Sequence, residues 1–289
     1  MELKHTAERD GRLSSFLNKE LGMSTGLINR LKWQDKISVN AVPRHTDYPV
    51  RRGDVITAIL DDPVPEYPAE DEPVTVIYED AHILAVDKPA GMLIHPSRNR
   101  ITGTLANRVI GYYKRTGQGC AFHPITRLDR DTFGIVLLAK NSHVHALFQQ
   151  TAMEKTYHAL TFGGPEEEQG VIDAPIARKE LPSLLRHIHP EGKPSVTKYR
   201  VLERKQDICK LALQPVTGRT HQLRVHCSYM GWPILGDPQY NCVSSVRLSE
   251  KLGMTTQALC AKKVEFIHPV TGESMCLASQ MDVQSGESI

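Results

Sequence analysis

The first sixty residues carry apolar positions at helical spacing, followed by apolar positions at strand spacing. A first helix is predicted from residues that recur every three or four positions, namely Leu13, Phe16, Leu17 and Leu21. Ser24 is placed to cap a second helix, whose buried face holds Leu27, Ile28 and Leu31. Alternating apolar residues then predict a hairpin that turns near Asn40, and Val55–Leu60 predicts a last strand. Together these elements describe a small α+β unit.

From residue 74 onward the pattern is dominated by strands. Ile135–Ala139 is a continuous apolar strand, and the apolar residues after it line one face of a helix that begins at Asn141 or Ser142. Further strands are predicted at Val74–Tyr78, Ile83–Val86, Tyr157–Phe162, Val196–Leu202 and Ile208–Gln214. Because these strands follow one another without regular intervening helices, we expect an α+β fold with a mostly antiparallel central sheet rather than a doubly wound one.

Residues 61–73 separate the two patterns. This segment is acidic and rich in proline, which removes backbone donors and fixes φ, so an extended linker is expected. The predicted organisation is therefore a small N-terminal domain over residues 1–60, a linker over 61–73 and a large domain over 74–289.

Composition narrows the class of protein. The formal net charge is only +2, so any affinity for nucleic acid must come from local clusters of charge. The longest apolar run is far shorter than the roughly 20 residues of a membrane span, and the polar start Met1–Asp10 does not resemble a secretory signal. The six cysteines form no C-x-x-C pair. We therefore expect a cytoplasmic protein with reduced thiols and no membrane partner.

A set of basic residues falls on the second helix and around the hairpin of the N-terminal domain. They are Arg30, Lys32, Lys36, Arg44, Arg51 and Arg52. On their own they are explained equally well by a solvated charged surface. The pattern resembles the small RNA-binding domain named after a small-subunit ribosomal protein, the S-four domain, and this resemblance implies that these side chains grip phosphates of structured RNA.

Three segments of the larger domain carry candidate chemistry. In the first, residues 126–134, Asp129 is flanked by arginines, and a carboxylate in that setting keeps its charge and can act as a nucleophile. Local chemistry alone favours a simpler interpretation, an Arg–Asp network that anchors a turn. In the second segment, residues 155–159, strand alternation puts Lys155 and Tyr157 on one face, where a tyrosine is ordinarily a core residue.

The third segment, residues 217–226, predicts a basic helix start. Gly218 is expected to permit a tight turn, and Thr220 to cap a helix that carries Arg224. His221 and His226 are five positions apart, which is the wrong spacing for two metal ligands on one helix face. No metal site is predicted.

Taken together, the three segments resemble the successive signature motifs of RluA-type pseudouridine synthases, in the family's order and at comparable spacing. The matching stretches are Arg127-Leu128-Asp129, Lys155-x-Tyr157-x-Ala159 and residues 218–226, with supporting matches at 86–92 and 231–237. The resemblance covers roughly residues 74–270. It implies the pseudouridine synthase fold, isomerisation of uridine in structured RNA, for which we expect ribosomal RNA, and no cofactor.

The resemblance also implies roles for individual residues. Asp129 attacks C1′ or assists cleavage of the N-glycosidic bond. Tyr157 stacks on the uracil and can help to move a proton, and Arg224 pairs with Asp129 and holds it ionised and oriented. Arg127 enters the stack where the target base has left, because a base within a duplex must flip out before this reaction. Three positions depart from the family pattern, Thr126, Phe133 and Cys260, and a bulky Phe133 is expected to alter the rim of the pocket.

Two other functions fit parts of the sequence. One is a catalytically inactive RNA-binding protein that assists ribosome assembly, and retention of the four motif residues argues against it. The other is a hydrolase that uses Asp129 and Asp131 as paired acids on a nucleoside or glycoside. Free uracil would be a product only of the hydrolase.

Overall fold

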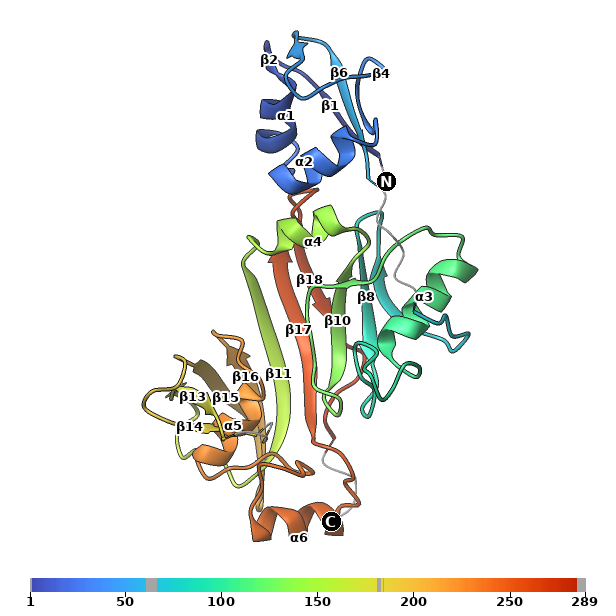
Figure 1. Cartoon of the computed structure of the whole chain (residues 1–289). Helices are drawn as coiled ribbons and strands as arrows, with labels where there is room; N and C mark the ends of the chain where they lie inside the picture. The colour runs from blue at the N-terminus through green and yellow to red at the C-terminus, as the bar shows by residue number, and fades with distance from the viewer. Residues whose placement is uncertain (1, 61–66, 181–182, 184, 285–289) are drawn as a thin grey trace.

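The computed structural model describes residues 2–60, 67–180, 183 and 185–284. Residues 2–60 form a lobe with a hydrophobic core of its own, which lies at one end of the molecule in Figure 1. Its elements are β1 (Glu2–Thr6), β2 (Gly11–Arg12), α1 (Leu13–Lys19), α2 (Thr25–Lys32), β3 (Ile37–Val39), β4 (Val42–Pro43), β5 (Pro49–Val50) and β6 (Val55–Ile59). The main sheet of the lobe has the order β1-β6-β3-β4.

The local predictions for this lobe agree with its structure. Oγ of Ser24 accepts a hydrogen bond from the amide of Leu27 at 3.2 Å and so caps α2. The β3–β4 hairpin turns at Asn40 and Ala41, which both have positive φ, as a tight hairpin turn requires. α1 is shorter than predicted, because it ends at Lys19 and leaves Leu21 beyond the helix, partly buried against the core.

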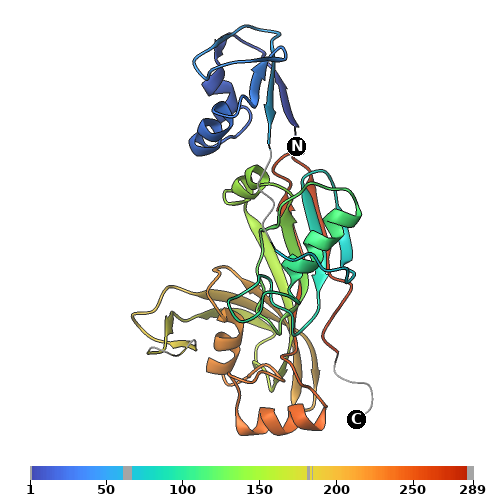
Figure 2. The same ribbon diagram turned by 45° about the vertical axis from the view of Figure 1, so that its right-hand side comes forward.

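A ten-stranded sheet organises the larger domain (Figures 1 and 2). Its main path runs β12-β15-β16-β11-β17-β10-β8-β7, with β18 paired to β17 and β9 paired to β10. The strands are β7 (Thr75–Glu79), β8 (Ile83–Lys88), β9 (His123–Pro124), β10 (Phe133–Ala139), β11 (Met153–Phe162), β12 (Gln169–Asp173), β15 (Val196–Lys205), β16 (Ile208–Pro215), β17 (Leu259–Ile267) and β18 (Ser274–Ala278). β13 (Ile176–Arg178) and β14 (Arg186–Ile188) form a separate hairpin.

Among the described strands of this sheet, the pairs are antiparallel except for β10 with β17. The α+β class with a mostly antiparallel central sheet is therefore confirmed. The parallel pair joins segments more than 120 residues apart, Phe133 opposite Cys260, and no local pattern predicts it.

Helices cover both faces of the sheet. They are α3 (Leu105–Arg115), α4 (Ser142–Phe148), α5 (Gln222–Tyr229) and α6 (Val243–Lys251). α3 packs on Val136 and Leu138 of β10, whereas α4 packs on the alternate residues Ile135 and Leu137. Because neighbouring side chains of a strand point to opposite faces, α3 and α4 lie on opposite sides of the sheet. Tyr157 shares the cluster of α4, so its ring points to that same face.

The proline-rich segment is only partly described. Residues 61–66 lie outside the described ranges, so the expectation of an extended linker there has no structural counterpart. Residues 67–73 have no regular secondary structure and dock on α3, where the amide of Glu70 donates to the carbonyl of Asn107 at 3.1 Å. Gly111 makes this approach possible, since a Cβ there would lie 1.8 Å from the carbonyl oxygen of Glu70. Within the described ranges, no helix is long and apolar enough to cross a bilayer.

Candidate active site

Three contacts fix the loop that carries Asp129, between β9 and β10. Oγ1 of the buried Thr126 accepts a hydrogen bond from the amide of Leu137 at 2.9 Å. The ammonium group of Lys88, which is fully buried, donates to the carbonyl of Arg130 at 2.8 Å. At the far end Gly134 has a φ of +108°, and a Cβ there would lie 2.4 Å from the carbonyl oxygen of Ala261. The loop is therefore held at both ends by contacts that larger or differently shaped residues would break.

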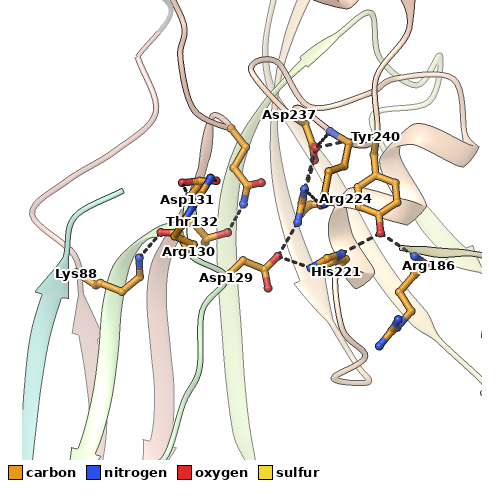
Figure 3. Close-up of polar contacts among 12 residues, drawn as sticks. Lys88, Asp129, Arg130, Asp131, Thr132, Arg186, His221, Arg224, Asp237 and Tyr240 are labelled. Carbon is orange, nitrogen blue, oxygen red and sulfur yellow. Dashed lines mark hydrogen bonds and ion pairs between the residues drawn. The ribbon is translucent and has the colours of Figure 1, made fainter. Parts of the chain in front are cut away.

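Asp129 lies in a cavity of about 400 Å³ with its side chain 32% exposed. Oδ2 of Asp129 lies 3.0 Å from Nη1 of Arg224, which projects from α5 (Figure 3). The two residues are 95 positions apart in the sequence. The cavity is also lined by Arg127, Leu128, Lys155, Tyr157, His221 and Leu223. Sequence motifs that are distant along the chain thus meet at one site.

Arg224 is a buried cation shared between two carboxylates. Its Nε and Nη2 donate to the two oxygens of Asp237 at 2.7 and 2.9 Å, and Nη2 also donates to Oε1 of Gln239 at 2.8 Å. Burial alone would lower the pKa of Arg224, but the hydrogen bonds and charges of Asp237 and Asp129 outweigh it and raise that pKa. The guanidinium also stacks on the ring of Tyr240, 4.9 Å from its centroid.

Tyr157 provides an aromatic wall of the cavity. It lies on β11 opposite Leu213 of β16 and Ala261 of β17, and its half-buried ring packs between two hydrophobic clusters. Burial, reinforced by the negative charge of Asp129, raises the pKa of Tyr157 to about 12. The phenol is therefore neutral at pH 7. Lys155 lines the same cavity, as strand alternation predicts.

The start of α5 differs from the prediction. The residue that precedes the helix is His221, with φ of +57°, rather than Thr220, and its side chain makes no capping hydrogen bond. Gly218 does not have positive φ, so the strained position of this turn is a histidine and not the glycine. The side chain of Gln222 provides the hydrogen bonds of this turn instead. Its Oε1 accepts from the amide of Arg219 at 3.0 Å and from Oγ1 of Thr217 at 2.8 Å.

Several residues of the site are not predicted by the sequence pattern. From the sequence, His221 is considered only as a possible metal ligand, yet its Nε2 lies 3.8 Å from Oδ2 of Asp129. Asp237 and Tyr240 complete the surroundings of Arg224, and only Asp237 falls within a matching stretch of sequence. Within the described ranges no three His, Cys, Asp or Glu side chains come together to hold a metal ion.

Two further predicted positions, Arg127 and Phe133, differ in where they lie relative to the cavity. Arg127 is exposed at the cavity. Phe133 packs into a cluster with Leu160 and Leu235 and does not line the cavity, so the expectation that it alters the rim was wrong. Phe133 is the first residue of β10, and its side chain packs in that cluster while the preceding Thr132 lines the cavity.

The basic residues of the N-terminal lobe do not contact the Asp129 cavity. Arg30 and Lys32 lie on α2 and Lys36 follows it, whereas Arg44, Arg51 and Arg52 lie in exposed loops of the lobe. Arg30 also lines a crevice between α2 and α4. Arg44 stacks on Tyr48, with its guanidinium 4.5 Å from the ring centroid.

Comparisons with known proteins agree with this geometry. The family model described as RNA pseudouridylate synthase matches residues 82–229, which include the Asp129 loop, β11 and α5. The uncharacterized RNA pseudouridine synthase YjbO of Bacillus subtilis is 35% identical over 263 residues, which are 89% of this chain and 90% of that protein. The ribosomal large subunit pseudouridine synthase D of Pasteurella multocida is 33% identical, over 86% of this chain and 81% of the other.

Structural similarity extends to a human protein. The solved structure of human RNA pseudouridylate synthase domain containing 1 superposes with a TM-score of 0.59 at 25% identity, covering 75% of this chain and 93% of that one. The pseudouridine synthase fold predicted from the motifs is confirmed by this likeness. The chain therefore belongs to the RNA pseudouridylate synthase family and isomerises uridine in RNA.

Proposed function

We propose that Asp129 is the nucleophile of this enzyme and that its substrate is a uridine in ribosomal RNA. The observation that carries the assignment is the 3.0 Å contact of a partly exposed Asp129 carboxylate with the buried guanidinium of Arg224. A carboxylate that is both open to a cavity and held by a fixed cation is charged, oriented and accessible, which a nucleophile requires. Ribosomal RNA is supported by the name of the relative from Pasteurella multocida.

The reaction breaks the N1–C1′ bond, turns the uracil and joins C5 to C1′, after which the proton on C5 is lost. In the proposed steps, a carboxylate oxygen of Asp129 bonds to C1′ as the N1–C1′ bond breaks, and uracil leaves as its anion into the cavity of about 400 Å³, a volume in the range of small-ligand pockets. The turned uracil then attacks C1′ through C5, which breaks the bond between Asp129 and C1′ and frees the carboxylate. The C5 proton passes to solvent water, and N1 takes up a proton. Tyr157 supplies a neutral aromatic surface for the detached base, and stacking of this kind contributes about 1–3 kcal/mol.

Access to the base requires that the nucleotide leave its helix. Unpairing and unstacking cost a few kcal/mol. The exposed Arg127 lies at the cavity, where its planar guanidinium can stack in the vacated space and offset part of that cost.

Residues 1–60 act in this proposal as the RNA-docking domain, of the S-four type. The exposed arginines Arg44, Arg51 and Arg52 and the basic residues of α2 contact phosphates and fix the register of the RNA. Base identity is tested separately in the Asp129 cavity. Cytoplasmic location and independence from any cofactor complete the proposal.

Asp129→Asn tests the nucleophile. With RNA labelled with tritium at uracil C5, the wild-type enzyme releases tritium, and the variant is expected to release none while its unfolding midpoint stays unchanged. Turnover at the wild-type rate by the variant would end the assignment. Absence of release by both proteins would favour the inactive assembly factor, and free uracil as product would favour the hydrolase. The hydrolase is disfavoured by Asp131, whose two oxygens are engaged by Arg130 at 2.9 and 2.8 Å.

A further inference from the structure

A chain of hydrogen bonds runs from the β13–β14 hairpin to the Asp129 cavity, through two side chains that have no part in the proposed reaction steps. The amide of Arg186 donates to the hydroxyl of Tyr240 at 2.9 Å, and that hydroxyl lies 2.9 Å from Nδ1 of His221. The second ring nitrogen, Nε2, lies 3.8 Å from Oδ2 of Asp129. Figure 3 shows the imidazole between the tyrosine and the carboxylate.

The bonding pattern favours one of the two nitrogens of His221 as the proton carrier. The oxygen of Tyr240 already accepts from the amide of Arg186, and Nδ1 of His221 is the acceptor within reach of the tyrosine proton among the described residues. The hydroxyl therefore donates to Nδ1, and a neutral His221 carries its proton on Nε2. Burial lowers the pKa of His221 from its usual value of 6.5, although the charge of Asp129 opposes this, so the ring is neutral at pH 7.

The backbone of His221 is held in an unfavourable conformation. Its φ of +57° lies in the left-handed region, which a residue other than glycine rarely adopts. Such strain persists where the surrounding structure imposes it and is concentrated at functional sites. Here it places the imidazole in the same cavity as Arg224, three residues further along the chain.

We propose that His221 is a positioning residue for Asp129, a neutral N–H donor locked in one tautomer by Tyr240. The inference rests on the proposed role of Asp129 as the nucleophile. Within the described ranges, the polar contacts of the Asp129 side chain both end on Oδ2, from Arg224 at 3.0 Å and from His221 at 3.8 Å. Among the described residues none donates to Oδ1, so this arrangement confines one oxygen and leaves the other to face the ribose.

The neutral state of His221 matters to this role. A separation of 3.8 Å is longer than a hydrogen bond, so the N–H acts on Oδ2 as an oriented dipole. In the proposal, this distance shortens to a hydrogen bond when the carboxylate turns toward the substrate. A second full positive charge beside Arg224 would instead stabilise the carboxylate and weaken it as a nucleophile. The hydrogen bond from Tyr240 to Nδ1 thus directs the Nε2–H of His221 toward Asp129 without adding a positive charge.

The tautomer is measured directly by long-range proton–nitrogen correlation on the full-length protein with ¹⁵N-labelled histidine. The signals of His221, one of 13 histidines, are assigned by their loss in His221→Gln. We expect a protonated Nε2 and an unprotonated Nδ1 in the wild-type protein at pH 7. In Tyr240→Phe, whose ring keeps its contacts with Arg224 and His221, we expect a shift toward protonated Nδ1. A protonated Nδ1 in the wild-type protein overturns the tautomer lock.

The positioning role is measured by single-turnover tritium release and by RNA affinity. His221→Gly removes the donor but suits a positive φ, so the protein is expected to fold, and an unchanged unfolding midpoint verifies this. We expect its rate to fall about 10- to 100-fold, the scale of a small misplacement of a reacting group, with the Kd for RNA unchanged. His221→Gln, which keeps an N–H donor, should recover part of the rate.

A wild-type rate in His221→Gly, or a loss confined to RNA affinity, overturns the positioning role. Failure of the nucleophile assignment gives a different result. An active Asp129→Asn variant would refute that assignment, whereas the tautomer of His221 is measured separately, in the wild-type protein, and does not depend on that result.

Discussion

Replacement of Arg224 by methionine separates the contribution of this residue to stability from its proposed contribution to catalysis. The substitution removes two charged hydrogen bonds from Asp237, whose side chain is 0% exposed. Breaking a buried ion pair by removing one partner costs about 3–5 kcal/mol, because the other charge is left without compensation. Asp237 keeps two backbone donors, the amides of Gln239 and Tyr240 at 2.9 and 3.1 Å, so we expect the lower end, about 3 kcal/mol.

Adding Asp237→Asn to Arg224→Met should restore part of that stability, because the uncompensated charge is gone. We expect a recovery of about 2 kcal/mol, within the usual range of coupling between neighbouring residues. Activity should not recover, since Asp129 still lacks its cation. Stability and tritium release are thus predicted to respond in different ways to the second substitution.

Urea unfolding followed by tryptophan fluorescence measures the change in stability. The chain has two tryptophans, and Trp232 is 7% exposed in the cluster beside α5, whereas Trp33 is 78% exposed in the N-terminal lobe. In a Trp33→Phe background the signal therefore reports on the larger domain. Arg219→Met serves as a control, because its exposed guanidinium donates a hydrogen bond to the carbonyl of Pro194 and its removal should cost under about 1 kcal/mol. Equal stability of Arg224→Met and wild type would refute the reasoning, as would recovered activity in the double variant.

Three further outcomes are expected. Tyr157→Phe keeps the stacking surface and should bind RNA as the wild type does. Because the pKa of Tyr157 is raised to about 12, the pH–rate profile of the variant should keep the wild-type shape between about pH 5 and 9, and a profile that gains or loses an inflection in this range would contradict this. The double variant Arg51→Gln/Arg52→Gln should bind RNA more weakly. The magnitude of the slope of log affinity against log salt concentration should fall by about one for each phosphate that the variant no longer binds, and an unchanged slope would show that neither residue contacts the RNA. Burial would raise the pKa of Asp282, but the hydrogen bonds from Lys210 and His158 outweigh it and lower that pKa below 3.8. The stability that this carboxylate contributes is therefore present above pH 3.8 and is lost as the pH falls further. Hydrogen exchange near residue 282 should then rise, and an Asp282→Asn variant should lack this response.

The parts of the fold that can be predicted from the sequence are those set by local pattern. Ser24 caps α2 because capping depends on a side chain and an amide three residues away. Ile135–Ala139 forms a buried strand because a short continuous apolar run suits a strand that is covered on both faces. The parallel pairing of β10 with β17 depends on residues far apart in the sequence, and no periodicity carries that information.

In the site, too, contacts between residues far apart in the sequence are the ones that local pattern does not predict. The pairing of Asp129 with Arg224 is predicted only through resemblance to a family, since nothing in the spacing of residues 95 positions apart requires contact. Asp237 is not identified as a partner because a buried carboxylate and an exposed one look alike in sequence. His221 escapes prediction because a histidine at positive φ is uncommon and glycine is the expected residue for the turn.

The distribution of hydrogen bonds around Arg224 explains how one cation serves two carboxylates with different roles. A guanidinium that gripped Asp129 with both arms would hold it charged but would also engage both of its oxygens. Here the paired arms, Nε and Nη2, bind Asp237, which is sealed from solvent and therefore fixes the plane of the guanidinium. The remaining Nη1 gives Asp129 a single bond on Oδ2. The buried carboxylate thus makes the arginine rigid, and that rigidity lets one hydrogen bond orient the exposed carboxylate while its other oxygen stays available for the proposed attack on C1′.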